Sequence, residues 1–444
     1  MANAPMGDRS HGDKSERAEA LFAKQAVEYT GRYVVVLDEN EPERGMAELR
    51  SSVGIASAEH VRGSDAESSA ELLRRADVSV LIDELGIALV DVEPDQRHAL
   101  AMTAEREPTI VAAEPERMMY ASVITEPQRM VTGFFPSYRS DEEEVDRQTR
   151  AAGAAGLGPA WDEHQTTWGL QATRANWSLL TGRDVKVAVL DTGVDTDHQD
   201  LAGCIHGTAS FVPGATVEDG NGHGTHCIGT AAGPGKADHT IRYGVAGDAQ
   251  VLAGKVLNDR GRGPDGQILM GIAWAVEQGA RVVSLSLGSL VEAGELFPQT
   301  YEIAAQRARQ QGTLIVAAAG NSSRRPHFVA PVERPANCPS ILAVAALGKD
   351  LATAWFSCGS VNGRGGEVDI AAPGVEVFSA APDDTYQTLD GTSMATPHVA
   401  GVVALIAEAH PDASAAELST RLISGAYPLT HSTKDVGSGL LQAS

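Results

Sequence analysis

The sequence predicts an α/β protein in which a parallel sheet flanked by helices follows a small ferredoxin-like α+β domain. Strand-like and helix-like segments alternate from Trp168 to the C-terminus, which is typical of a parallel sheet with helices on both faces. Upstream of this region, the predicted order of the segments is β-α-β-β-α-β, the order of a ferredoxin-like unit. The length of 444 residues also exceeds that of one ordinary domain. We therefore expect two domains.

The smaller domain is expected between residues 32 and 121. Its strands are predicted from short apolar runs and its helices from the segments between them, with strands at 33–37, 79–83, 86–90 and 110–113 and helices at 44–56 and 95–106. Residues 1–31, ahead of this domain, are polar. Residues 122–166, after it, carry charge and glycine with little apolar periodicity, so we interpret them as a linker or a surface insertion.

The larger domain is expected to span residues 167–444. Residues 185–190 form a nearly continuous apolar run, as expected for a strand buried in a parallel sheet. A helix is predicted over 266–279, where apolar residues recur at helical spacing. The next predicted elements are a strand at 281–287, a helix at 301–310 and a strand at 313–318. In such a sheet, catalytic groups belong at the carboxyl ends of the strands.

Composition narrows the class of function. The formal net charge of -24 argues against nucleic acid and an anionic membrane as partners, because both require clustered lysine and arginine. The sequence contains no run of about 18 apolar residues, so we expect no membrane-spanning helix. The N-terminal residues lack the apolar core of a signal peptide. A cytoplasmic location, a leader that this sequence does not include and export by another route all remain open.

The cysteines give no sign of a metal site. Their spacing is long and irregular and contains no CxxC pair, so we expect no structural zinc site from Cys204, Cys227, Cys338 and Cys358. A disulfide cannot be assigned, because four thiols allow three pairings. Buried free thiols are the simplest interpretation.

Four short segments carry residues that together suit acyl transfer. Each ends a predicted strand or begins a predicted helix: Val-Leu-Asp191-Thr-Gly, Asn-Gly-His223-Gly-Thr-His, Ala-Ala-Ala-Gly-Asn321 and Gly-Thr-Ser393-Met-Ala-Thr-Pro-His-Val-Ala-Gly. A serine hydroxyl needs an imidazole to take its proton, and the imidazole needs a carboxylate to hold its tautomer. An amide side chain and a backbone N–H at a helix start can bind the oxyanion. Singly, each residue could be a cap, a turn residue or a structural histidine; their joint occurrence favours catalysis.

With these motifs in this order, the sequence from about Trp168 to Ser444 resembles the subtilase family of serine peptidases. The resemblance implies a subtilisin-like fold and a serine endopeptidase that works through an acyl-enzyme. It implies that Asp191 orients the imidazole, His223 is general base and acid, Ser393 attacks and Asn321 binds the oxyanion. We expect a monomer that acts on polypeptides and needs no cofactor for the chemistry.

Two further segments resemble the substrate-binding strands of the family: Gly261, Arg262 and Gly263, and Ser286, Leu287 and Gly288. In relatives these strands add an extended peptide to a sheet edge through main-chain hydrogen bonds. An ordinary loop and strand end is the alternative interpretation. The loop from Ser322 to Pro339, which is expected to form a wall of the main specificity pocket, differs from the common version. A preference for large apolar side chains is therefore implied by the family alone.

The resemblance also bears on metals and on one thiol. Cys227 lies one helical turn after His223, as in the proteinase K branch, which implies a buried thiol beneath the histidine and inhibition by mercurials. Asp369, with the carbonyls of Pro339 and Ile341, matches a structural calcium site of that branch. Asp200 matches a calcium position of subtilisins, although residues 233–243 depart from the subtilisin calcium loop. Surface carboxylates are common without a metal, so calcium binding remains open.

Residues 33–121 resemble the propeptide of the family, a ferredoxin-like inhibitor and folding assistant. In relatives, the tail of the propeptide lies in the active site and is cut there. The tail is expected at Met118-Met-Tyr120-Ala-Ser122, with Tyr120 filling the main specificity pocket. The propeptide is then an intramolecular partner of a self-processing precursor. Two alternatives are a relative that binds peptides without cutting them and a maturation protease with a single substrate.

Overall fold

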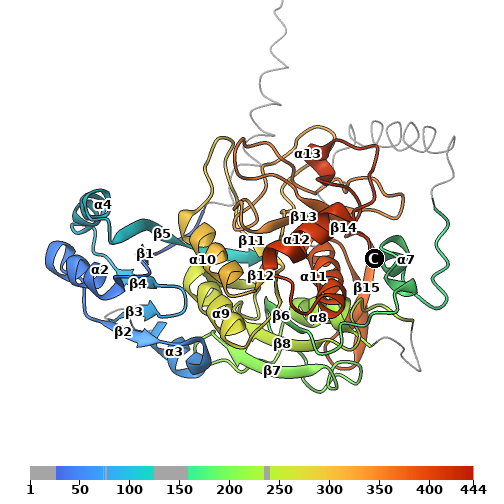
Figure 1. The fold of residues 1–444 in the computed structure, drawn as a ribbon, viewed down its shortest axis with the longest axis horizontal. Coiled ribbons are helices and arrows are strands. Elements are labelled where there is room, and N and C mark those ends of the chain that lie inside the picture. Colours follow the sequence, from blue (N-terminus) through green and yellow to red (C-terminus); the bar gives the residue numbers. More distant parts are fainter. Residues whose placement is uncertain (1–26, 74, 76–77, 125–158, 235–240, 444) are drawn as a thin grey trace, which may run out of the picture.

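The structure is a computed structural model that describes residues 27–124, 159–234 and 241–443, apart from residues 74, 76 and 77. Figure 1 shows a smaller α/β unit beside a larger one, with the strand β5 (Ile110–Ala121) reaching from the first into the second. The predicted segments 1–31 and 122–166 lie largely outside the described residues. Of the second segment, residues 122–124 continue from β5 and residues 159–166 precede the larger unit.

The larger unit is built on a seven-stranded parallel sheet of order β14-β13-β12-β10-β6-β8-β7. Its strands are β6 (Lys186–Asp191), β7 (Ile205–Ser210), β8 (Gln250–Lys255), β10 (Val282–Leu285), β12 (Leu314–Ala318), β13 (Leu342–Leu347) and β14 (Ile370–Pro373). The predicted parallel sheet is confirmed. Beside it lie the short strands β9 (Arg262–Pro264) and β11 (Leu287–Gly288) and the hairpin of β15 (Val377–Ala381) and β16 (Thr385–Leu389).

Helices cover both faces of this sheet. Apolar residues alternate along the strands, so that Ala188 and Leu190 of β6 face α9 (Asp265–Glu277) and α10 (Gln299–Gln310). Val187 and Val189 face the other way, toward α8 (His223–Ala232), α11 (Thr392–Ala409) and α12 (Ala415–Ser424). The short helices α7 (Trp168–Ala172) and α13 (Thr433–Val436) lie at the periphery. No helix in the described part of the chain is long and apolar enough to span a membrane.

The smaller unit has the predicted β-α-β-β-α-β order with two additions, β2 (Ala58–Val61) and α3 (Ala66–Leu73). Its other elements are β1 (Tyr29–Leu37), α2 (Pro42–Glu48), β3 (Ser79–Ile82), β4 (Ile87–Asp91), α4 (Arg97–Arg106) and β5. The strand order is β5-β1-β4-β3-β2, and β2 joins β3 in parallel at the edge. The sequence analysis missed β2 because only Val61 of its four residues is buried, which leaves no apolar run to detect.

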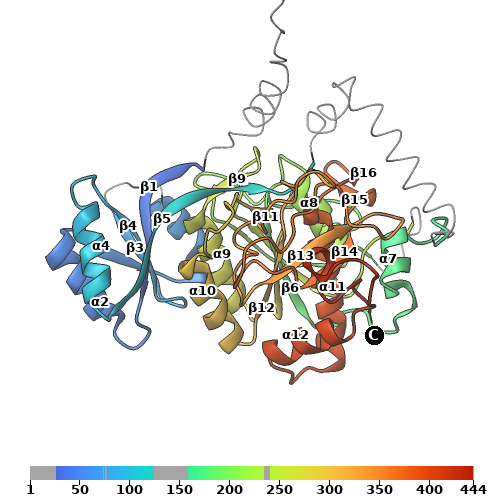
Figure 2. The ribbon, with the colours of Figure 1, turned by 90° about the horizontal axis from the view of Figure 1, so that it is seen from above.

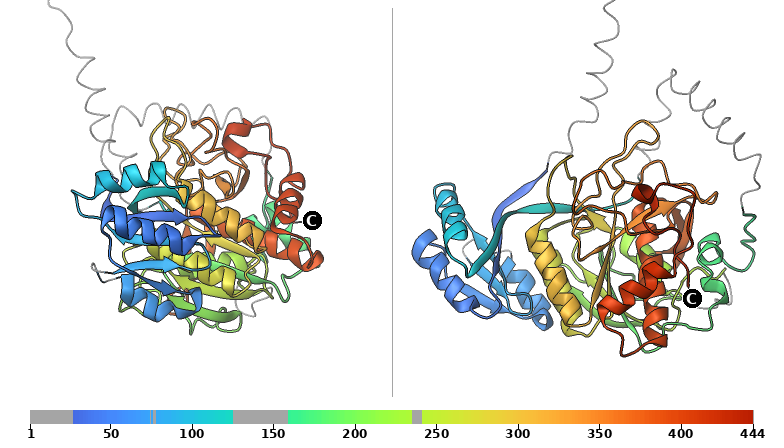
Figure 3. Two further views of the ribbon diagram at one scale, coloured as in Figure 1. Left: turned by 60° about the vertical axis from the view of Figure 1, so that its left-hand side comes forward. Right: turned by 45° about the horizontal axis from the view of Figure 1, so that its top comes forward.

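The two faces of the small unit's sheet belong to different hydrophobic cores. Val35 and Leu37 of β1 pack with α2 and α4. Val34 and Val36 point the opposite way and share a core with α9 and α10 of the larger unit. Figures 2 and 3 show the small sheet between these two pairs of helices. In addition, Arg307 of α10 donates a hydrogen bond to the Leu37 carbonyl at 2.8 Å. The smaller unit thus depends on the larger one for half of its core.

All four cysteines are buried and unpaired in the structure. The interpretation as free thiols is confirmed, and Cys227 lies in the helix that begins with His223.

Because the two units pack closely, we expect a single added methyl group at their interface to lower the stability of the protein. A Cβ atom at Gly63 would lie 2.4 Å from the Trp274 backbone of α9, so Gly63→Ala should lower the free energy of unfolding by about 1–3 kcal/mol, the usual cost of overpacking. Urea unfolding of the full chain measures this. Gly203→Ala is the matched control, because a Cβ atom there meets nothing within 4 Å. Equal stability of the two variants would contradict this account of the interface.

Candidate active site

The end of β5 lies between the edges of β9 and β11. Tyr120 is opposite Arg262 on one side and Gly288 on the other, and both pairings are antiparallel. Figure 2 shows β5 leaving the small sheet and running to this position. The residues that flank it are those expected to bind substrate, namely Gly261, Arg262, Gly263, Ser286, Leu287 and Gly288.

Main-chain hydrogen bonds extend this pairing by two residues. The Ala121 N–H donates to the Gly261 carbonyl at 2.9 Å, and the Ser122 N–H donates to the Ser286 carbonyl at 3.1 Å. Such bonds use only backbone groups, so they fix the position of the segment along the groove whatever its side chains. They bring the Ser122 carbonyl to the carboxyl ends of the larger sheet.

Asn321 donates a hydrogen bond to this carbonyl. Its Nδ2 atom lies 2.6 Å from the Ser122 oxygen, while its Oδ1 atom accepts from the backbone N–H and the hydroxyl of Thr392, both at 2.9 Å. The two donors on Thr392 fix the orientation of the amide. A Cβ atom at Gly391 would lie 2.7 Å from the Ser122 oxygen, so only glycine leaves room for the carbonyl.

Asp191 and His223 form a buried pair. Asp191 ends β6 and His223 begins α8, and the His223 Nδ1 atom lies 2.7 Å from the Asp191 Oδ1 atom. Burial alone lowers the pKa of His223, but the Asp191 carboxylate, helped by Cys227, outweighs it and raises the pKa well above the ordinary value. The carboxylate therefore stabilises the protonated imidazole.

Asp219 holds these two elements together, although the sequence analysis did not select it. Its Oδ1 atom accepts from the Thr192 hydroxyl at 2.8 Å and the Gly222 N–H at 2.8 Å, and its Oδ2 atom accepts from the Thr225 N–H at 2.8 Å. Burial alone would raise the pKa of Asp219, but these bonds lower it. The signal was available, because Asp219 begins the glycine-rich segment that leads to His223.

Ser393 lies buried in the first turn of α11. Its hydroxyl donates to the Ser286 carbonyl at 3.0 Å, while the His223 Nε2 atom is buried without a hydrogen-bond partner among the described residues. The Cys227 sulfur contacts both residues through other atoms. It lies 3.9 Å from His223 Nδ1 and 3.6 Å from the backbone carbonyl oxygen of Ser393. That carbonyl is available because Pro397, four residues later, has no N–H to donate to it.

The structure places Tyr120 differently from the expectation. The carbonyl that Asn321 contacts belongs to Ser122, two residues further along the chain than Tyr120. Tyr120 instead lies beside Arg262, whose guanidinium carbon is 5.1 Å from the centre of the ring. The hydroxyl of Tyr120 also accepts a bond from Arg262 at 3.2 Å. The antiparallel register with β9 and β11 decides this position.

Asp369 lies where one of the two calcium sites was expected. Its Oδ2 atom accepts from the Ala343 N–H at 2.7 Å, two residues beyond Ile341 in the segment that begins at Pro339. Burial raises the pKa of Asp369 to about 6. A carboxylate offers the oxygen ligands that calcium prefers.

Asp200 is engaged by neutral donors. Its Oδ2 atom accepts from the hydroxyls of Tyr243 at 2.8 Å and Tyr386 at 2.9 Å. Within the described residues, one group of three His, Cys, Asp or Glu side chains brings its ligand atoms within 4.8 Å of one another: Asp191, His223 and Cys227. That group contains the buried pair described above and does not include Asp200.

A buried carboxylate–imidazole pair, a serine at a helix start and an amide donor on a backbone carbonyl lie together at the carboxyl edge of a parallel sheet. This fold and site define a serine peptidase of the Asp-His-Ser type.

Comparisons with known proteins agree with this assignment to the serine peptidases. Residues 182–440 match the model of the subtilase family. The chain is 43% identical over 280 residues to subtilisin BL of Lederbergia lenta, covering 62% of this chain and 96% of the relative. It is 41% identical over 248 residues to thermitase of Thermoactinomyces vulgaris, covering 55% and 82%. The structure resembles that of sphericase with a TM-score of 0.56 and 32% identity, covering 64% of this chain and 100% of that one. The chain belongs to the subtilase family and is a subtilisin-type serine endopeptidase.

The charge of Asp191 should control the protonation of His223. Asp191→Asn removes the carboxylate that raises the pKa of His223, so we expect this pKa to fall. NMR titration of the His223 ring measures it. Asp197→Asn, at an exposed site in the loop after β6, is the control and should leave the pKa unchanged. An unchanged His223 pKa in Asp191→Asn would contradict the pairing.

Proposed function

We propose that Ser393 is the nucleophile of this peptidase and that His223 takes its proton. The hydroxyl oxygen attacks the substrate carbonyl carbon, and the proton passes to the Nε2 atom of His223. Asp191, bonded to Nδ1, holds the tautomer and stabilises the imidazolium. The unpartnered Nε2 atom supports this role, because a buried acceptor without a bond is ready to receive a proton.

Asn321 and the backbone N–H of Ser393 stabilise the oxyanion. The bond from Asn321 to the Ser122 carbonyl supports this role, since a donor on the ground-state carbonyl is near the place where negative charge develops. The peptide C–N bond then breaks, and His223 returns its proton to the leaving amine. Water then gives a proton to His223 and attacks the acyl carbon. The Ser393 oxygen leaves and takes the proton back from His223. None of these steps calls for a cofactor.

We further propose that the precursor inhibits itself and cuts its own chain between Ser122 and Val123. The observation that carries this proposal is the bond between Asn321 and the Ser122 carbonyl, made by a segment held on both sides by backbone pairing. Beyond that bond, the Ile124 N–H donates to the Asp390 carbonyl at 3.0 Å, so the chain continues across the site. A substrate cannot enter the groove while this segment occupies it.

Two glutamates of β5 support a role of the smaller unit as inhibitor. Glu114 accepts from the Gln299 N–H at 2.8 Å and the Thr300 hydroxyl at 2.7 Å at the start of α10. Glu116 accepts from the Gly266 N–H at 2.9 Å at the start of α9. Carboxylates are favoured at helix N-termini, where backbone N–H groups lack partners. These three bonds hold β5 in line with the groove.

Loss of the Ser393 hydroxyl should stop self-processing. We expect wild type to release a fragment that begins at Val123, whereas Ser393→Ala stays full length on a denaturing gel. Mass spectrometry of both proteins gives the cut position. Ser424→Ala, an exposed serine on α12, is the control and should be processed like wild type. Cleavage of Ser393→Ala at the same bond, or a wild-type cut after Tyr120, would contradict the proposal.

We also propose that Asp369 holds a structural calcium ion with the carbonyls of Pro339 and Ile341. The raised pKa supports this, because a carboxylate that burial makes costly to ionise gains from a cation. Calcium plays no part in the chemistry.

Thermal unfolding with calcium and with EGTA tests the metal. We expect calcium to raise the unfolding temperature of Ser393→Ala protein, and Asp369→Asn to abolish the increase. The increase should be larger at pH 8 than at pH 5, since the pKa of about 6 leaves Asp369 protonated at the lower pH. Asp200→Asn is the control and should retain the response. A full response in Asp369→Asn would rule out this site.

A further inference from the structure

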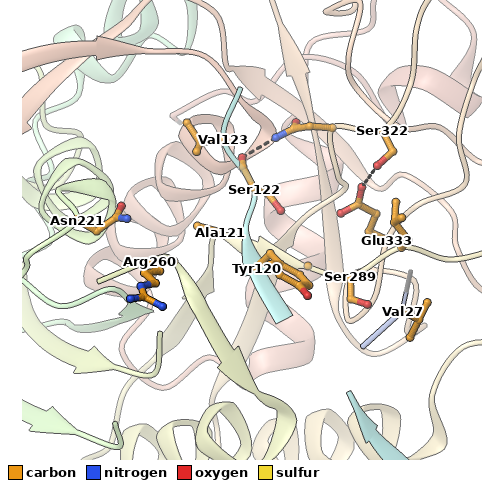
Figure 4. A pocket seen from close by; sticks show the side chains of 14 residues that line it. Val27, Tyr120, Ala121, Ser122, Val123, Asn221, Arg260, Ser289, Ser322 and Glu333 are labelled. Carbon is orange, nitrogen blue, oxygen red and sulfur yellow. Dashed lines mark hydrogen bonds between the residues drawn. The ribbon is translucent and has the colours of Figure 1, made fainter. Parts of the chain in front are cut away.

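Glu333 lies in the pocket beside Ser122. The pocket holds about 320 Å³ and is lined in part by Ser122, Gly288, Asn321, Ser322 and Glu333. Figure 4 shows the Ser122 carbonyl bonded to Asn321, and the Ser122 side chain directed toward the side where Glu333 lies. The side chain of Ser122, the residue before the proposed cleavage site, therefore shares its pocket with a carboxylate.

Two glycines make room for this carboxylate. A Cβ atom at Gly320 would lie 2.4 Å from the Glu333 Cδ atom, and a Cβ atom at Gly288 would lie 2.9 Å from its Oε2 atom. Gly288 belongs to the strand that flanks the segment, and Gly320 precedes Asn321. The carboxylate thus packs directly against both walls of the groove at the position of Ser122.

Glu333 has hydrogen bonds but no cationic partner. Its Oε1 atom accepts from the Ser322 hydroxyl at 2.5 Å, and the Cys358 sulfur lies 3.9 Å from the same atom. Among the residues that the structure describes, no lysine or arginine forms an ion pair with it. Burial raises the pKa of Glu333, and the bonds from Ser322, the Asn321 backbone and Cys358 only partly offset this.

Arg334, which follows Glu333 in the sequence, and Arg324 have other partners. Arg334 forms an ion pair with Asp265 at 3.5 Å, and its guanidinium carbon lies 5.6 Å from the centre of the Tyr301 ring. Arg324 donates to the Asn321 carbonyl at 3.2 Å and lies over Trp355. A buried carboxylate without a counter-charge is unfavourable, and a cation that enters the pocket removes the cost.

We propose that Glu333 makes this peptidase prefer lysine or arginine immediately before the cut bond. The inference rests on the proposed function, since it takes Ser122 to occupy the position before that bond. The aliphatic stem of a long basic side chain passes between the two glycine walls, and its charged end meets the carboxylate. This preference differs from the large apolar one that the family alone implies.

The segment of the chain itself presents only a serine to this carboxylate. Because the segment is tethered, Ser122 is held in place at a high effective concentration. The bond after it can therefore be cut although its side chain is a poor match for the pocket. After the cut, the Ser122 side chain still supplies no cation to the Glu333 carboxylate. A substrate with lysine or arginine gains an interaction that the inhibitor lacks, which favours exchange of inhibitor for substrate.

Four peptide p-nitroanilides that differ only in the last residue, arginine, lysine, phenylalanine or leucine, test the proposal. For the processed wild-type enzyme, we expect kcat/KM for arginine and lysine to exceed that for phenylalanine at least about tenfold. Glu333→Gln keeps the shape of the side chain and removes its charge, so the arginine-to-phenylalanine ratio should fall about 10- to 100-fold. Glu367→Gln, at an exposed glutamate, is the control and should keep the wild-type ratio.

A second variant tests the same pocket without altering it. Ser122→Arg in the precursor supplies the missing cation, so we expect the cut after residue 122 to be faster than in wild type, and Glu333→Gln to cancel the gain. A preference for phenylalanine or leucine that Glu333→Gln leaves unchanged would overturn the proposal while leaving the peptidase intact. Absence of any cleavage by wild type, of these peptides or of casein, would instead overturn the proposed function.

Discussion

The structure depends on one backbone pairing, the insertion of β5 between the edges of β9 and β11. Each strand edge offers N–H and C=O groups that need partners, and the chain itself supplies them. Because the bonds are main-chain bonds, they fix a register and not a sequence. The register brings the Ser122 carbonyl to Asn321 and so decides which bond faces the catalytic groups. The location of the small domain, the blocked groove and the pocket beside Ser122 all follow from this pairing.

The catalytic groups are rigid for a different reason, which is burial. Asp191 ends a central strand, and Ser393 begins a helix whose residues are buried from Thr392 to Ala407. Asp219 ties the strand end to the helix that carries His223. These elements come from distant parts of the chain and converge because parallel strands end at the same edge of the sheet. The end of β5 is added to a site that these buried elements already fix.

The sequence predicted the sheet, the small domain and the four motif residues, because each is marked by a local pattern. It did not predict Ser122, since register depends on bonds to strands more than a hundred residues away. Tyr120 was expected in the main pocket from the resemblance to the family, whereas the register set by backbone bonds brings the Ser122 carbonyl to Asn321. The position of Glu333 was also hidden, because the loop before it has no periodicity and the glycines that accept its side chain are distant in sequence.

The dependence of the small domain on the large one bears on how the proposed self-inhibition ends. One face of its sheet, with Val34 and Val36, shares a core with α9 and α10, and two glutamates of β5 bond to the starts of those helices. Separation exposes this apolar face and leaves the carboxylates without their N–H donors. The separated domain therefore loses half of its core, and we expect it to unfold as it leaves. An unfolded chain is itself an extended substrate, so under the proposed self-inhibition the release of this domain and its destruction are coupled.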